Sequence, residues 1–214
     1  ADGLLTVVGG GGGLSVEGNA GAHNSIYRGK YLGTTYTAAQ QAAVAAGTFD
    51  DLFIGDYWTI GGVNYRIAAF DYYLNCGSTA LATHHMIVVP DTNLYTHVME
   101  DSNITTNGYY GSKMRTSGLN QAKTTAAAAF GAGHILTYKE YLTNASSNGK
   151  PSGASEYDCT VELMCERMVY GNPYYGTVCD GVNTPSIYSY SKTQLPLFAL
   201  RPDLICNRAT FWLR

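Results

Sequence analysis

Charged side chains are scarce in this chain of 214 residues. Asp, Glu, Lys and Arg together make up 14% of it, against roughly 25% in an ordinary soluble domain. The net charge is -3 and no run of lysine or arginine occurs, so the chain lacks the basic surface that nucleic-acid binding normally requires. We therefore expect no nucleic-acid partner.

Long apolar runs are also missing. No stretch approaches the roughly 18 consecutive apolar residues that cross a membrane. The beginning of the chain lacks the basic-then-apolar pattern of a secretory signal. We expect no insertion into a membrane.

The cysteines are few, and their spacing indicates no cross-link or metal. There are five, an odd number, and none lies in a C-x-x-C pattern, so neither a disulfide framework nor a zinc ribbon is indicated. Reduced thiols fit assembly in a bacterial cytoplasm, where disulfides are rare. We expect reduced, mostly buried thiols at Cys76, Cys159, Cys165, Cys179 and Cys206.

Apolar and aromatic residues, by contrast, are plentiful. Hydrophobic residues make up 45% of the chain, enough for a substantial core, and 18 residues are tyrosine. Tyrosine offers apolar area and a hydroxyl group at a small entropic cost. This composition is typical of a surface that is buried in an assembly or that touches protein and carbohydrate partners.

The first 28 residues predict an extended arm. Five consecutive glycines, Gly9–Gly13, favour a backbone that is ordered only where a neighbour holds it. The apolar segment Leu4–Val8 before them predicts a strand or an apolar plug that docks on another part of an assembly. A phosphate-binding loop is the alternative, but no Lys-Ser/Thr follows the glycines. We place the domain boundary at residues 28/29.

The next segments carry clear local signals. Residues 38–46 are strong helix formers, with Thr37 as the N-cap and Gly47 as the terminator. Two β-prone runs within residues 55–70 flank Gly61-Gly62, which predicts a hairpin with a tight turn. The apolar run 84–90 predicts an interior strand that ends at proline.

The second half of the chain predicts short helices joined by polar loops. We expect helices over 117–130 and 137–144, a surface loop over 145–155 and a helical turn over 194–200. The segment 161–170 fits a helix or a strand. Short helices between separated strands indicate the α+β class.

Two groups of residues are candidate metal ligands. His84 and His85 are neighbours in an expected strand, so their side chains point to opposite faces and cannot share one ion. Asp50, Asp51 and Asp56 could offer oxygen ligands to calcium, but the chain has no D-x-[DN]-x-[DN]-G loop. We expect neither a metal nor a cofactor, with calcium as the alternative.

Catalytic patterns are weak. The segment 13–17, Gly-Leu-Ser-Val-Glu, departs from the G-x-S-x-G motif of hydrolases, and H-E-x-x-H is absent. A glycosidase needs a pair of carboxylates, and four acidic residues lie close together in the sequence: Glu156, Asp158, Glu162 and Glu166. If 161–170 is a helix, Glu162 and Glu166 share a face, which is more often a solvated face. We expect no enzyme.

A succession of motifs resembles a known family. They are Gly29-Lys30-Tyr31-Leu32-Gly33, Gly55-Asp56-Tyr57-Trp58, Tyr65-Arg66-Ile67-Ala68, Tyr141-Leu142-Thr143-Asn144-Ala145 and Phe211-Trp212-Leu213-Arg214. Together they resemble structural proteins of tailed phages and prophages of gut Firmicutes. The last motif is similar to the W-L-R signature of the C-type-lectin-like, or formylglycine-generating-enzyme-like, fold. The fold-signature residues are therefore Gly55, Asp56, Tyr57, Trp58, Trp212, Leu213 and Arg214.

The resemblance implies a C-type-lectin-like domain over residues 29–214, with its C-terminal end cut short after Arg214. It implies a non-enzymatic protein of the virion surface, such as a capsid decoration, head fibre or tail adhesin. Its partners would be other virion proteins, further copies of itself and a bacterial surface or glycan. A cement protein without receptor binding and a cell-wall or polysaccharide hydrolase are the alternatives.

Two tyrosine pairs are candidates for contact with a ligand. Tyr109-Tyr110 and Tyr174-Tyr175 each lie beside glycine in a stretch that resembles a turn. We expect them to be exposed, although packing in the core is an equal alternative for at least one pair.

Overall fold

Two small antiparallel sheets and several short helices make up the described part of the protein. The computed structural model describes residues 20–104, 106–148, 150–172 and 193–205. In this part, β1 (Tyr57–Ile60), β2 (Val63–Phe70) and β3 (Met86–Pro90) form one sheet in the order β1-β2-β3. The other sheet is a hairpin of β4 (Tyr138–Ser147) and β5 (Lys150–Cys159). The class is α+β, as predicted.

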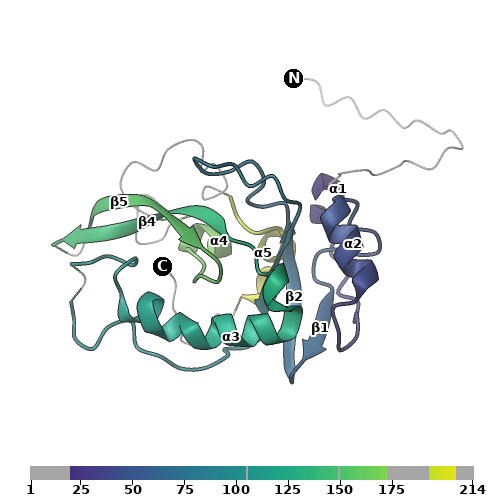
Figure 1. Ribbon diagram of the computed structural model, residues 1–214, viewed down its shortest axis with the longest axis horizontal. Helices are drawn as coiled ribbons and strands as arrows, with labels where there is room; N and C mark the ends of the chain where they lie inside the picture. The colour runs from purple at the N-terminus through teal and green to yellow at the C-terminus, as the bar shows by residue number, and fades with distance from the viewer. Residues whose placement is uncertain (1–19, 105, 149, 173–192, 206–214) are drawn as a thin grey trace, which may run out of the picture.

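The helices lie on both sides of the three-stranded sheet. Figure 1 shows α1 (Ala20–Asn24) and α2 (Ala38–Ala46) on one side, and α3 (Leu119–Phe130) with the β4–β5 hairpin on the other. Two further helices are α4 (Glu166–Tyr170) and α5 (Pro196–Leu200), and single turns are η1 (Met114–Gly118), η2 (Ala132–His134) and η4 (Pro202–Leu204). Among the described helices, none is long and apolar enough to cross a lipid bilayer.

Helix α2 is capped as the sequence predicted, and its cap is tied to the core. The Thr37 hydroxyl accepts a hydrogen bond from the Gln40 N–H at 3.3 Å, and Gln40 Oε1 accepts one from the Thr37 N–H at 2.9 Å. The same Oε1 also accepts a hydrogen bond from the indole N–H of Trp58 at 3.1 Å. Gly47 ends the helix with a left-handed backbone. One amide oxygen thus joins α2 to β1.

The β1–β2 hairpin confirms its prediction. Ile60 pairs with Val63, and the two turn residues between them, Gly61 and Gly62, have φ angles of 59° and 80°. A two-residue turn with positive φ at both positions matches the twist of the strands. Trp58 is completely buried, at 0% exposure, and forms edge-to-face contacts with Tyr36 and Phe130.

This turn gives the first testable prediction. A Cβ at Gly61 or Gly62 would meet no atom within 4 Å, so a substitution there costs only backbone strain. We expect Gly62→Val to lower the free energy of unfolding by about 1–2 kcal/mol, measured by urea denaturation. Gly61→Asn is the control and should stay within about 0.5 kcal/mol of the wild type, because Asn adopts positive φ readily. Equal effects of the two variants would contradict this account.

The β4–β5 hairpin overturns two predictions. Residues 137–144 were expected to be a helix and 145–155 a loop, but they form the paired strands β4 and β5. The register joins Ser147 to Lys150 across Asn148-Gly149, a dipeptide that favours tight hairpin turns. In β4 the side chains of Glu140 and Leu142 point to one face, and both are fully buried. Because Glu140 is acidic but buried, the sequence does not show the alternation of apolar and polar residues that is typical of a strand.

The folded unit begins earlier than expected. Residues 20–28 were assigned to the arm, yet the amide of Asn24 donates to the Phe70 carbonyl at 2.9 Å and accepts from the Phe70 N–H at 2.8 Å. The His23 ring is buried and its Nδ1 lies 2.6 Å from the Leu52 carbonyl oxygen. The arm prediction now concerns residues 1–19, which lie outside the described residues.

Other predictions were met in part. The helix expected over 117–130 is α3, which begins at Leu119 after the π turn η1 and ends at Gly131. Within 161–170, which was left open, only Glu166–Tyr170 is helical, and the expected turn over 194–200 is α5. Of the five cysteines, three fall in the described part of the chain, and all three are buried thiols: Cys76, Cys159 and Cys165.

Candidate functional site

A groove runs along strand β3 in the described part of the chain. It has a volume of about 460 Å³. All five residues of β3, Met86–Pro90, line it, and its other walls come from α2, α3, the segment 133–136 and the segment 160–164. A cavity of several hundred Å³ that is mostly apolar is typical of a binding site.

Strand β3 was expected in the interior, and this expectation was wrong. Within the described part of the sheet it pairs only with β2, and of its five residues only Val89 is buried. The residues of β3 are apolar because they form a wall of the groove, and the wall of an apolar groove has the same composition as a buried strand. The sequence alone does not distinguish a strand covered on both sides from one that borders a cavity.

The outer edge of β3 carries backbone groups that point away from β2. The His85 carbonyl oxygen accepts a hydrogen bond from the Asp71 N–H at 2.9 Å, and the Asp91 N–H donates to the Asn64 carbonyl oxygen at 2.9 Å. The backbone groups of residues 85 and 91 therefore point toward β2. Hydrogen bonding alternates along an antiparallel strand, so residues 87 and 89 also face β2. The backbone N–H and C=O groups of Met86 and Val88 therefore point outward, along the groove.

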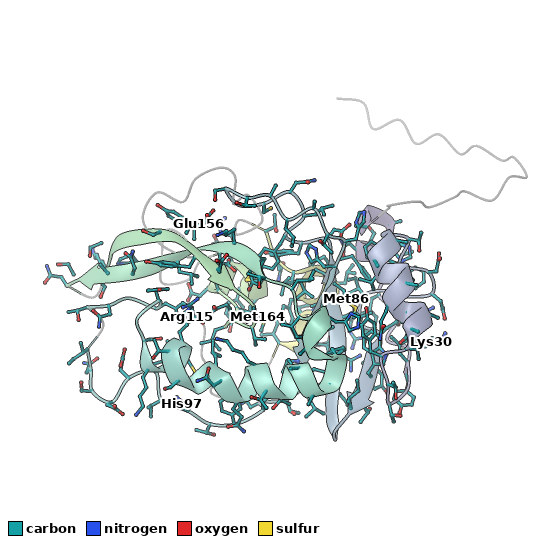
Figure 2. All side chains as sticks on the ribbon, viewed as in Figure 1. Lys30, Met86, His97, Arg115, Glu156 and Met164 are labelled. Atoms are coloured by element: carbon teal, nitrogen blue, oxygen red, sulfur yellow. The ribbon has the colours of Figure 1, made fainter. Side chains whose placement is uncertain are left out.

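The side chains that line the groove are largely uncharged. Apolar walls are formed by Met86, Val88, Leu94, Phe130, Ile135 and Met164. Figure 2 shows Met86 and Met164 in the middle of the molecule. Glu162 also lines the groove, but its side chain is only 3% exposed and is paired with Arg115.

Two buried tyrosines, Tyr65 and Tyr36, also line the groove. Among the described residues, the buried Tyr65 hydroxyl has no hydrogen-bond partner, which is costly for a polar group. Burial raises the pKa of Tyr36, another lining residue, to about 12, which keeps its hydroxyl protonated at neutral pH.

The two adjacent histidines also border the groove, and Asp71 holds them both. His84 Nδ1 lies 2.7 Å from Asp71 Oδ2, and the backbone N–H of His85 donates to Asp71 Oδ1 at 3.0 Å. His85 Nε2 accepts from the Tyr73 N–H at 3.0 Å, so the proton of the neutral ring is on Nδ1, which donates to the Thr83 carbonyl at 2.9 Å. In the described residues no three His, Cys, Asp or Glu side chains are grouped as metal ligands.

His85 predicts a dependence of stability on pH. Burial lowers the pKa of His85 below its usual 6.5, although the Thr83 carbonyl and Asp71 act in the opposite direction. The unfolded chain therefore binds the proton more readily, and folding stability is lost as the pH falls below about 6.5. We expect a smaller loss between pH 7 and pH 5 in His85→Gln, measured by urea denaturation at each pH. Equal pH dependence in the two proteins would contradict this assignment.

Of the three candidate calcium ligands, Asp51 and Asp56 bind cationic side chains, and Asp50 accepts a hydrogen bond from the Thr48 hydroxyl at 2.9 Å. Asp56 is completely buried and accepts hydrogen bonds from the Arg28 guanidinium, the Lys30 N–H and the Phe53 N–H. Asp51, which is exposed, pairs with Arg28 and with Lys30. The pKa of Asp51 is lowered by its hydrogen bonds to Lys30 and Arg28. These contacts support a structural role for both carboxylates.

The acidic cluster does not form the solvated helical face that was expected. Glu162 precedes α4, accepts the Tyr109 hydroxyl at 2.7 Å and pairs with Arg115 at 3.0 Å. Glu156 lies on β5 and accepts the Ser78 N–H at 2.8 Å; Figure 2 marks Arg115 and Glu156. Contacts between distant segments decide these pairings, so no local pattern could reveal them.

The candidate contact tyrosines have different environments. Tyr109 was expected to be exposed but is buried at 8% exposure, because its hydroxyl donates to Glu162 and accepts the Leu163 N–H. Tyr110 is half-buried and stacks on Tyr157, with ring centroids 3.5 Å apart. The Arg115 guanidinium lies over the Tyr110 ring at 4.7 Å. Outside the described residues lie Tyr174, Tyr175, Trp212, Leu213 and Arg214.

The described members of the fold signature all have structural roles. Gly55 has a φ angle of 85°, and a Cβ there would lie 2.1 Å from the Tyr27 ring, so only glycine fits. Asp56 and Trp58 are completely buried, and the Tyr57 ring lies under the Arg66 guanidinium at 4.7 Å. The motif holds β1 in place and does not line the groove.

Comparison with known proteins adds no relative. No family model, curated protein or solved structure matches the chain.

Proposed function

We propose that this chain is a non-enzymatic structural protein of a tailed-phage virion that presents a C-type-lectin-like domain on the particle surface. The succession of motifs from Gly29 to Arg214 supports this assignment. Within this succession, Gly55, Asp56 and Trp58 have structural roles, which fits a motif that serves folding. Its partners are other virion proteins, further copies of the chain, and a bacterial surface or glycan.

The observation that carries the binding role is the apolar groove beside β3. Its lining is rich in aliphatic and aromatic side chains, and its edge offers backbone groups, which suits recognition of a polypeptide or another apolar partner. Three of the four candidate carboxylates for hydrolysis have structural partners: Glu162 binds Arg115 and Tyr109, Glu156 binds Ser78, and Asp158 binds Lys139.

The decisive experiment is localisation in assembled particles. An antibody or tag on this chain, imaged by electron microscopy of purified virions, is expected to label the particle surface. A domain that projects from the surface supports attachment, whereas one lying flat across subunit junctions supports the cement alternative. Particles without label would refute the virion assignment.

Enzymatic activity is tested separately. Purified protein on a zymogram of peptidoglycan or of capsular polysaccharide is expected to give no clearing. Clearing by the wild type that is lost in Glu166→Gln would make the chain a hydrolase and overturn the non-enzymatic assignment. Glu166 is the first residue of α4, and its substitution leaves the ion pair between Glu162 and Arg115 intact, so it suits this test.

A further inference from the structure

We propose that the groove along β3 binds the apolar segment Leu4–Val8 of a second copy of the chain, as an added β-strand. The inference rests on the proposed function in one respect, namely that many copies are assembled side by side. It deepens that function by naming how the copies are joined.

The edge of β3 defines the shape of the occupant. The outward backbone groups of Met86 and Val88 are spaced two residues apart, which is the repeat that an extended strand presents. Within the described residues no strand pairs with this edge, and an occupant that pairs with it satisfies these groups. Strand addition of this kind provides affinity through the backbone and specificity through alternate side chains.

The lining defines the chemistry of the occupant. Met86, Val88 and Phe130 present aliphatic and aromatic surface, and a charged side chain placed against it would lose its hydration. The occupant is therefore an uncharged, apolar segment.

The chain itself contains a segment with these properties. Residues 4–8 read Leu-Leu-Thr-Val-Val, which is as long as β3, carries no charge and is rich in β-branched residues that favour strands. Thr6 supplies one hydroxyl. The segment lies outside the described residues.

The tether is long enough to reach a neighbour. Residues 9–19 separate the segment from α1, and eleven extended residues span at most about 36–40 Å. Helix α2, which lies on the same side of the sheet as α1, and helix α3 both contribute walls to the groove (Figure 1). We commit to a second copy because the proposed function places many copies side by side, and a segment that folds back onto its own groove is the competing outcome of the test.

The test uses the full chain and two substitutions that each introduce a charge. Val7→Asp alters the segment, and Val88→Asp alters the groove. Sedimentation of the wild type is expected to show association, and each variant should weaken it by about tenfold or more. Val98→Asp is the matched control, because Val98 is 50% exposed and away from the groove, and it should associate like the wild type. Circular dichroism confirms that each variant is folded.

Mixing the two variants tests the pairing directly. The Val7→Asp chain keeps an intact groove and the Val88→Asp chain an intact segment, so the mixture is expected to regain association that neither variant shows alone.

Other outcomes overturn the proposal. They are a monomeric wild type, an association that both charged variants leave unchanged, and a mixture that fails to associate. If the wild type is monomeric and Val7→Asp destabilises it, the chain's own segment fills the groove and no segment of a second copy does. Labelled virions with no such association would refute this inference alone, and association without virion labelling would refute only the proposed function.

Discussion

Replacing Asp56 with alanine is expected to lower the free energy of unfolding by about 3–5 kcal/mol, as measured by urea denaturation. Asp56 is completely buried and joins three separate segments, since it binds the Arg28 side chain and the backbone N–H groups of Lys30 and Phe53. The substitution leaves the two backbone N–H donors without their acceptor and the guanidinium with Asp51 as its remaining carboxylate partner. The cost is large because both N–H groups lose their hydrogen bonds and the Arg28 side chain, 27% exposed, loses a fully buried carboxylate.

Asp51 provides the matched control for this prediction. It pairs with the same Arg28, but its side chain is 65% exposed. An exposed ion pair contributes little, so Asp51→Ala should change the free energy of unfolding by about 0–1 kcal/mol. If the two alanine variants were equally stable, the Asp56 contacts would not hold the three segments together.

Trp58→Ala is expected to cost about 3–5 kcal/mol of unfolding free energy, measured in the same way. The indole is completely buried against Tyr36 and Phe130, so alanine removes a large apolar area and leaves a cavity. It also removes the N–H that donates to Gln40 Oε1. The Gln40 oxygen keeps its bond to Thr37, so α2 should remain helical.

Trp58→Phe separates packing from hydrogen bonding. Phenylalanine keeps an aromatic ring in the core and loses the indole N–H, so its cost should be well below that of alanine. Comparable losses in the two variants would assign most of the effect to the hydrogen bond with Gln40, which would contradict the packing account.

Several elements followed from local sequence because their determinants lie within a few residues of one another. Thr37, Gln40 and Gly47 define both ends of α2, and Gly61-Gly62 defines the β1–β2 turn. In each case the chemical requirement, a side-chain acceptor or a positive φ angle, is met by neighbouring residues. The α+β class follows from the order of such elements.

The β4–β5 hairpin shows where local pattern failed. Its turn signal, Asn148-Gly149, was present in the sequence, but Glu140 in the buried face and the small polar residues of β5 obscured the alternation. A carboxylate is compatible with that buried position because the Tyr73 hydroxyl, 67 residues away in sequence, donates to it at 3.3 Å. Only the folded chain brings these two groups together.

By itself, the sequence determined the class of the protein, the capped helix α2, the glycine turn of the first hairpin and the burial of Cys76, Cys159 and Cys165. The tertiary structure alone decided that β3 and Tyr65 border a groove, and that Asp56 and Glu162 bind arginines. The physical reason is range. Caps and turns are satisfied within a few residues, whereas grooves and buried ion pairs are formed by segments that meet only after folding.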